Sequence, residues 1–167
     1  MRITVVVMGV SGCGKTTLGQ ALAARLEVPF IEGDTLHPPA NIAKMASGIP
    51  LDDTDRAPFL EAVAAALHAS DRGAVASCSA LKRPYRDLIR RHAGDVTFVL
   101  PQMDKPALVA RLAARKNHFM PASLLDSQMA SLETPAPDER AVFVDGSLPT
   151  NEQIDAVLAA LNTGMTA

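Results

Sequence analysis

The sequence contains no tryptophan, one tyrosine and two cysteines among 167 residues. Two cysteines, Cys13 and Cys78, are too few for a disulfide framework and suit reduced thiols. No apolar run approaches the roughly 20 residues that span a bilayer, and the first residues enter a candidate strand too early for a signal peptide. We therefore expect a soluble, cytoplasmic protein that has no membrane partner.

The charged residues show no strong excess of either sign. The formal net charge is −2, from 16 basic and 18 acidic residues, and the pI is near 6.1. A general affinity for nucleic acid would need a basic face, so we expect no nucleic-acid partner, and any anion site must be local. With 48% hydrophobic residues, the chain is long enough to bury roughly 70% of its unfolded surface. The expected organisation is a single domain over residues 1–167.

The strongest motif follows the first apolar run. Residues 3–8 are mostly β-branched, which is typical of a buried parallel strand, and leucines at helical spacing follow Lys15. Between them lies the pattern of a phosphate-binding loop, in which Lys15 reaches the β- and γ-phosphates and Thr16 coordinates Mg²⁺. Its glycines let backbone N–H groups surround phosphate oxygens at a helix N-terminus. The expected nucleotide-binding residues are Gly9, Val10, Ser11, Gly12, Cys13, Gly14, Lys15, Thr16 and Thr17.

Apolar runs and helical patterns alternate along the rest of the chain. Further candidate strands are residues 28–31, 74–78, 96–100 and 141–144. Helical patterns follow the loop, begin near residues 56, 84, 104 and 150, and include a short stretch at 41–46. Such alternation predicts an α/β fold with a central parallel sheet of about five strands flanked by helices through right-handed crossovers.

Local signals predict where some helices begin and which side chains they bury. Asp55 is a candidate N-cap for the helix near residue 56. Thr150 and Gln153 form a candidate capping pair for the last helix. The side chains expected to face inward from the helix at 104–115 are Leu108, Val109 and Leu112.

A phosphate-binding loop alone does not separate a GTPase, an ATPase and a kinase. A GTPase should carry an Asn/Thr-Lys-x-Asp segment that reads guanine, and none occurs here. A motor or transporter ATPase usually has a longer chain and an apolar strand that ends in acidic residues, whereas the central strand here ends Ser77-Cys78-Ser79. The small size favours a kinase for a small acceptor.

Residues 33–56 hold the most specific pattern outside the loop. They include Gly33-Asp34-Thr35-Leu36-His37-Pro38, then Asn41, Lys44-Met45, Gly48-Ile49-Pro50-Leu51 and Asp53-Thr54-Asp55-Arg56. Later matches are Cys78-Ser79-Ala80-Leu81-Lys82, Tyr85-Arg86-Asp87, Arg115, His118-Phe119, Gln128 and Leu132-Glu133. Together they resemble the gluconate kinase family over nearly the whole chain, with Phe59 where the family's tryptophan is expected.

The resemblance implies a P-loop kinase fold, similar to shikimate and nucleoside monophosphate kinases. It also implies transfer of a phosphoryl group from ATP, with Mg²⁺, to the 6-hydroxyl of D-gluconate, which gives 6-phosphogluconate. Two alternatives stay open at this stage. One is a kinase for another hydroxy acid such as shikimate, and the other is a regulatory nucleotide-binding module without turnover. The carboxyl-rich segment between Gly33 and Arg56 argues for turnover.

Several residues are candidates for the acceptor site. Phosphoryl transfer needs a carboxylate to orient or deprotonate the acceptor hydroxyl, and Asp34, just after a predicted strand, is our candidate. His37 is expected to hydrogen-bond the sugar-acid hydroxyls, or else to support the Pro38-Pro39 turn. A guanidinium suits the gluconate carboxylate better than a point charge does. The expected acid-binding residues are Arg56 and Arg86, with Lys82 in support, although each alone is also compatible with a surface role.

The nucleotide side has further candidates. Arg115 and His118 are expected on a lid at about residues 115–135, where Arg115 stabilises the transferring group. Arg111 is expected to pack on the adenine, and the turn at 146–149 to frame it. Cys13 lies among loop N–H groups, a setting that favours a reactive thiolate, whereas Cys78 is expected to be packed. The oligomeric state stays open, with a homodimer as one option.

Overall fold

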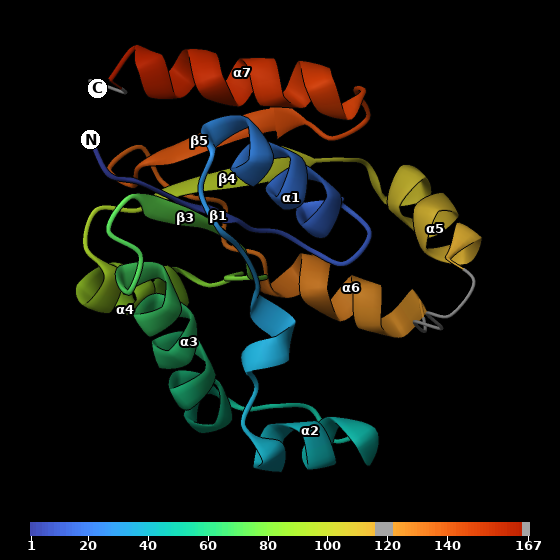
Figure 1. Cartoon of the computed structure of the whole chain (residues 1–167). Helices are drawn as coiled ribbons and strands as arrows, with labels where there is room; N and C mark the ends of the chain where they lie inside the picture. The colour runs from blue at the N-terminus through green and yellow to red at the C-terminus, as the bar shows by residue number, and fades with distance from the viewer. Residues whose placement is uncertain (116–121, 165–167) are drawn as a thin grey trace.

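The computed structural model describes residues 1–115 and 122–164. At its centre lies a parallel sheet of five strands in the order β2-β3-β1-β4-β5 (Figure 1). The strands are β1 (Ile3–Val7), β2 (Phe30–Glu32), β3 (Gly73–Ser77), β4 (Thr97–Gln102) and β5 (Ala141–Asp145). The predicted α/β class and strand number are confirmed.

Helices pack on both faces of this sheet, as Figure 1 shows. They are α1 (Lys15–Leu26), α2 (Pro39–Ala46), α3 (Asp53–His68), α4 (Arg83–Ala93), α5 (Lys105–Ala114), α6 (Ala122–Ser131) and α7 (Thr150–Asn162), with a 3₁₀ helix η1 (Gly33–Leu36). Helices α1 and α7 cover one face, and α3 and α4 cover the other. A two-sided cover explains why the strands read as continuous apolar runs.

The central strand β1 contributes to both layers of the core. Val5 and Val7 pack with Leu22 of α1 and Val157 of α7, whereas Val6 packs with α3 and α4 on the opposite face. This alternation follows from the two-residue period of a strand. Because all five strands are parallel, the segments that follow them meet at one edge of the sheet, where ligands of open α/β sheets bind.

Three local predictions were wrong. Asp52, not Asp55, is the N-cap of α3; Asp55 is the reciprocal member of a capping box. Helix α7 has no side-chain cap, because its N-cap is Pro149, which offers no side-chain acceptor, and Thr150 is already the first helical residue; Gln153 donates to the carbonyl of Leu148. Val109 is 43% exposed.

Helix α6 was not predicted as a separate element. It lies within the segment expected to form a lid, and it packs near α5 (Figure 1). Among the described residues, no helix is both long and apolar enough to cross a membrane.

Candidate functional site

The phosphate-binding loop lies between the end of β1 and the start of α1, as predicted. Gly14 precedes the first helical residue, Lys15, with a left-handed φ of 93°. Gly12 also has a positive φ of 87°, and a Cβ built on it would lie 3.1 Å from the Cγ of Leu112. Both positions therefore favour glycine, because a positive φ is unfavourable for other residues and a side chain at Gly12 would crowd Leu112. The loop leads directly into the N-terminus of α1, and a helix N-terminus is an anion-binding arrangement.

Lys15 and Thr16, at the end of this loop, each make a polar side-chain contact. The Nζ of Lys15 donates to the carbonyl oxygen of Val10 at 3.0 Å, so the ammonium lies across the loop. The hydroxyl of Thr16 donates to Oε2 of Glu32 at 2.7 Å. Thr17 is exposed in the first turn of α1.

Glu32 is a site residue that sequence reasoning missed. It ends β2, and its second carboxylate oxygen accepts from the Ser77 hydroxyl at 2.6 Å. The same hydroxyl accepts the N–H of Gly33 at 3.3 Å. Glu32 thus joins the ends of β2 and β3 to Thr16 of the loop. Its position at a strand end, two residues before Asp34, was the signal that could have identified it.

Asp34 and His37 lie at the same edge of the sheet. Asp34 is exposed within η1, immediately after β2. The His37 ring stacks on Phe59 of α3, with ring centroids 3.8 Å apart, and its Nδ1 lies 3.3 Å from Nδ2 of Asn41. Burial lowers the pKa of His37; Asp34 acts in the opposite direction and Arg56 adds to the lowering. The structure therefore holds His37 in place through Phe59 while keeping it near the two charged candidates.

Arg56 and Lys82 converge on one aromatic ring. The guanidinium carbon of Arg56 lies 5.6 Å from the centroid of the Tyr85 ring, and Nζ of Lys82 lies 5.9 Å from it. Arg56 also donates to the carbonyl of Leu51 at 2.6 Å. The Tyr85 hydroxyl donates to Asp53 at 2.5 Å, which holds the ring beside both cations. Tyr85 thus brings Arg56 and Lys82 together, and sequence reasoning did not single it out.

Arg86 does not belong to that site, so its predicted role is wrong. Its side chain is fully buried, and Nε and Nη2 donate to the Glu139 carboxylate at 2.7 and 3.1 Å. Nη1 donates to the carbonyls of Ala80 and Leu81 at 2.9 and 3.1 Å. Because these bonds occupy the guanidinium inside the protein, it is not presented to a substrate carboxylate.

Arg111 lies beside the phosphate-binding loop, and its predicted contact with the adenine stays a prediction. Its Nη2 donates to the carbonyl of Gly146 at 2.8 Å, and a Cβ built on Gly14 would lie 3.2 Å from its Nη1. Arg111 thus connects α5, the loop and the turn after β5. Arg115 is exposed directly after α5, and within the described part of the chain it makes no hydrogen bond to the loop. His118 lies outside the described residues.

Cys13 is buried among apolar side chains, which does not suit the reactive thiolate that was predicted. Its side chain is 2% exposed and packs with Val10, Leu108, Leu112 and Leu125. Burial raises the pKa of the Cys13 thiol, although Lys15 and Arg111 act in the opposite direction. The predicted thiolate is therefore wrong. Cys78 is packed as predicted, and burial is the main cause that raises its pKa to about 12.

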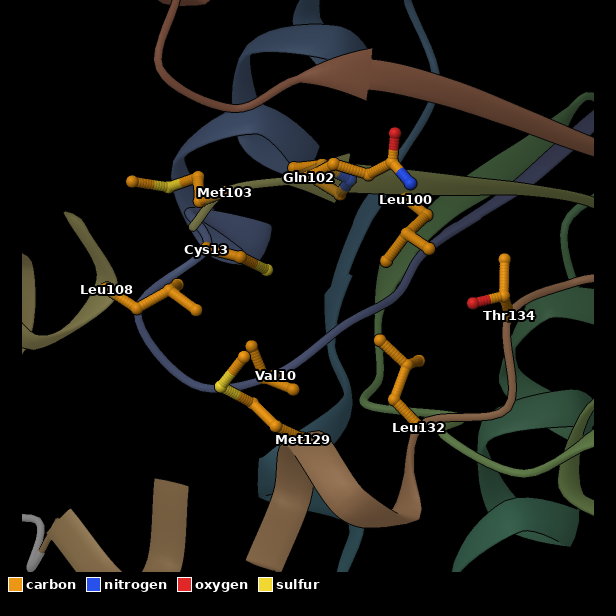
Figure 2. A pocket seen from close by; sticks show the side chains of 10 residues that line it. Val10, Cys13, Leu100, Gln102, Met103, Leu108, Met129, Leu132 and Thr134 are labelled. Atoms are coloured by element: carbon orange, nitrogen blue, oxygen red, sulfur yellow. The ribbon is translucent and has the colours of Figure 1, made fainter. Parts of the chain in front are cut away.

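The thiol of Cys13 borders a pocket of about 160 Å³ behind the loop (Figure 2). Val10 and Cys13 line it from the loop, Leu108 from α5, and Met129 and Leu132 from the α6 segment. Gln102 and Thr134 also line it, and none of the described residues that line it is charged, so this pocket differs in chemistry from the edge that holds Asp34, Arg56 and Lys82.

The strand order, the loop after the central strand and the charged acceptor edge together define a P-loop kinase of small molecules. A family model described as an AAA domain matches residues 5–135. A gluconokinase of Gluconobacter oxydans (strain 621H) is 51% identical over 144 residues, which cover 84% of this chain and 81% of the relative. The chain belongs to the gluconokinase family.

Two solved structures agree with this assignment. A gluconokinase from Sinorhizobium meliloti 1021 is 47% identical, has a TM-score of 0.88, and the match covers 98% of this chain and 94% of that one. A shikimate kinase from Aquifex aeolicus vf5 covers 99% of this chain and 98% of its own, with 17% identity and a TM-score of 0.61. That second likeness shows the fold alone.

Proposed function

We propose that this protein transfers the γ-phosphoryl group of ATP to the 6-hydroxyl of D-gluconate, giving 6-phosphogluconate and ADP. The observation that carries the proposal is the placement of two features at one sheet edge. Lys15 lies in a phosphate-binding loop after β1, and Arg56 and Lys82 flank Tyr85 beyond the neighbouring strand β3. A kinase for an acidic acceptor needs both a phosphate site and a second anion site.

Gluconate fits this arrangement because its carboxylate and its primary hydroxyl lie at opposite ends of the molecule. The carboxylate would bind Arg56 and Lys82, with the planar guanidinium of Arg56 offering paired donors. His37, held by stacking on Phe59, would hydrogen-bond hydroxyls between the two ends. Binding the acid end fixes which hydroxyl reaches the phosphate.

Asp34 would then orient the 6-hydroxyl and accept its proton. The hydroxyl oxygen forms the new bond to phosphorus while the bond from phosphorus to the β–γ bridging oxygen breaks, and ADP leaves with that electron pair. Lys15 neutralises charge on the β- and γ-phosphates. Arg111 would border the adenine with the turn at 146–149, a position supported by its bond to Gly146. Arg115 and His118 would complete the charge neutralisation from the lid.

The residues near the loop fit a magnesium ion. Mg²⁺ is usually held by one or two protein oxygens together with substrate phosphates. Thr16 and Glu32 supply a hydroxyl and a carboxylate 2.7 Å apart, and the described residues hold no cluster of three His, Cys, Asp or Glu side chains that would form a separate metal cage. When bound, the ion would supply charge neutralisation at the phosphates. Cytoplasmic location, the absence of nucleic-acid and membrane partners, and a homodimer stay predictions.

Steady-state ADP release with a panel of acceptors tests the proposal. We expect saturable turnover with D-gluconate, and little with shikimate or with the neutral polyol sorbitol. An acceptor-free control measures background hydrolysis of ATP. ADP release that no acceptor stimulates would contradict a kinase, and preference for shikimate would contradict the gluconate assignment.

A further inference from the structure

One peptide group of the phosphate-binding loop is held at both of its ends. The carbonyl oxygen of Val10 accepts from Nζ of Lys15 at 3.0 Å. The N–H of Ser11, in the same peptide, donates to Oε1 of Gln128 at 2.7 Å. Gln128 lies on α6, so this bond joins residues 117 positions apart in the sequence.

The two contacts lie on opposite sides of the loop. The described peptide bonds are all trans, and in a trans peptide the C=O and N–H point in opposite directions. Lys15 therefore lies on the side that the carbonyl of Val10 faces, and Gln128 on the opposite, outer side. Gln128 thus contacts the peptide group on the side away from Lys15.

Packing alone does not fix the loop at this point. Leu125 is 1% exposed and anchors α6 against Val10, Leu108 and Leu112. The pocket of about 160 Å³ is lined by Val10 and Cys13 of the loop and by Met129 and Leu132 at the end of α6 (Figure 2). Apolar packing between the loop and this part of α6 is therefore incomplete, and the hydrogen bond of Gln128 is a further contact between them.

The loop also has the freedom to lose this orientation. The Val10–Ser11 peptide lies between Gly9 and Gly12, whose φ angles are 129° and 87°. Glycine on both sides permits rotation of the intervening peptide at low steric cost. A rotated peptide would turn its carbonyl away from Lys15.

We propose that Gln128 is a positioning residue for phosphoryl transfer. By accepting the N–H of Ser11, it holds the Val10 carbonyl toward Lys15 and thereby sets the position of the ammonium that meets the β- and γ-phosphates. The same bond makes the position of Lys15 depend on α6. The inference rests on the proposed function for its catalytic consequence, but its effect on nucleotide binding does not require turnover.

The test compares three single variants in α6. Gln128→Met keeps the length of the side chain and removes the acceptor, Gln128→Glu keeps an acceptor, and Ser127→Met places methionine at an exposed neighbouring position as a control. Loss of one hydrogen bond corresponds to about a tenfold effect. We expect Gln128→Met to lower kcat about tenfold and to weaken MgATP binding about tenfold. Its melting temperature should equal that of the Ser127→Met control. At saturating ATP, Gln128→Glu should keep kcat within about threefold of the wild type.

A double-variant cycle separates positioning from simple support of α6. In MgATP titrations, Gln128→Met should have little further effect in a Lys15→Ala background, because both residues act through one contact. Equal, additive losses in both backgrounds would overturn the proposal, as would wild-type kcat and ATP affinity in Gln128→Met or equal impairment of the Met and Glu variants. Absence of gluconate turnover in the wild type would contradict the proposed function instead, and the titrations would still decide the role of Gln128.

Discussion

The side chains of Arg86 and Glu139 form an ion pair inside the protein, with exposed fractions of 0% and 1%. Both carboxylate oxygens are used, at 2.7 and 3.1 Å from the guanidinium nitrogens. The backbone N–H of Ala136 donates to the same carboxylate at 2.9 Å. The pair therefore joins α4 to the segment between α6 and β5, and both of its charged side chains are shielded from solvent.

Removing one partner of this pair should destabilise the fold strongly. Arg86→Met leaves the buried Glu139 with only the partly exposed Arg90 as a cation, at 3.2 Å, so we expect a loss near the lower end of the about 3–5 kcal/mol that breaking a buried pair typically costs. Urea unfolding should show a loss of that size. The double variant Arg86→Met/Glu139→Gln should recover part of it, because the buried carboxylate charge is removed and Arg90 still has Asp87 as a partner. A single variant as stable as the wild type would contradict the structural role.

The same pair predicts a dependence of stability on pH. Burial acts to raise the pKa of Glu139, but bonds from Arg86, the Ala136 N–H and Arg90 outweigh it and lower the pKa from 4.5 to about 2. Since the folded-state pKa is lowered, the stabilisation is complete above pH 4.5 and is lost as the pH falls toward 2. This carboxyl contributes a slope of up to about 1.4 kcal/mol per pH unit in that window.

Unfolding free energies measured across the window check this dependence. Glu139→Gln should flatten the acid limb, whereas Glu61→Gln, which removes an exposed carboxylate of α3, should not. An identical acid limb in wild type and Glu139→Gln would contradict the lowered pKa.

Much of the fold could be predicted from the sequence because its signals are local. The β-branched run before Gly9 and the pattern through Thr16 identify strand, loop and helix by composition alone. Arg86 shows the limit of such local signals. Its motif suggested a substrate contact, but the partner that buries it, Glu139, lies 53 residues away and no local pattern announces it. Helix α6 was missed because the lid was treated as one segment.

Cys13 illustrates the same limit at the scale of one side chain. The sequence placed it in the loop, but it did not show that its side chain packs in an apolar cluster. Sequence indicates that a residue lies in a loop, but the packing of α5 and α6 decides which side of the loop is solvated. Tyr85 and Glu32 were overlooked because their partners lie in other parts of the chain. Tyr85 contacts Arg56 and Lys82, and Glu32 contacts Thr16.

Arg56 and Lys82 should matter more for an acidic acceptor than for a neutral one. Replacing either with Ala removes a charge-assisted contact to the gluconate carboxylate, and we expect its KM to rise about 10- to 100-fold. The low residual sorbitol phosphorylation, measured beside it as kcat/KM at high enzyme concentration, should change much less. Arg91→Ala, at an exposed position of α4, serves as the control. Equal effects on both acceptors would show that these cations do not bind the carboxylate.

Neither cysteine should react readily in the folded protein. Both cysteine residues are 2% exposed, and burial is the main cause of their raised pKa values, to about 12 for Cys78. Ellman's reagent at pH 8 should therefore modify both thiols in denaturant and neither within minutes under native conditions. Labelling of Cys13 faster than global unfolding would contradict the packing behind the loop.

The most direct test of the whole account is the identity of the product. Wild-type protein incubated with MgATP and ¹³C-labelled gluconate, followed by ³¹P and ¹³C NMR, should yield 6-phosphogluconate and ADP in equal amounts. Lys15→Ala should keep the wild-type circular dichroism spectrum and form neither product above background. Release of ADP without phosphorylated gluconate, or normal turnover by Lys15→Ala, would contradict phosphoryl transfer at this loop.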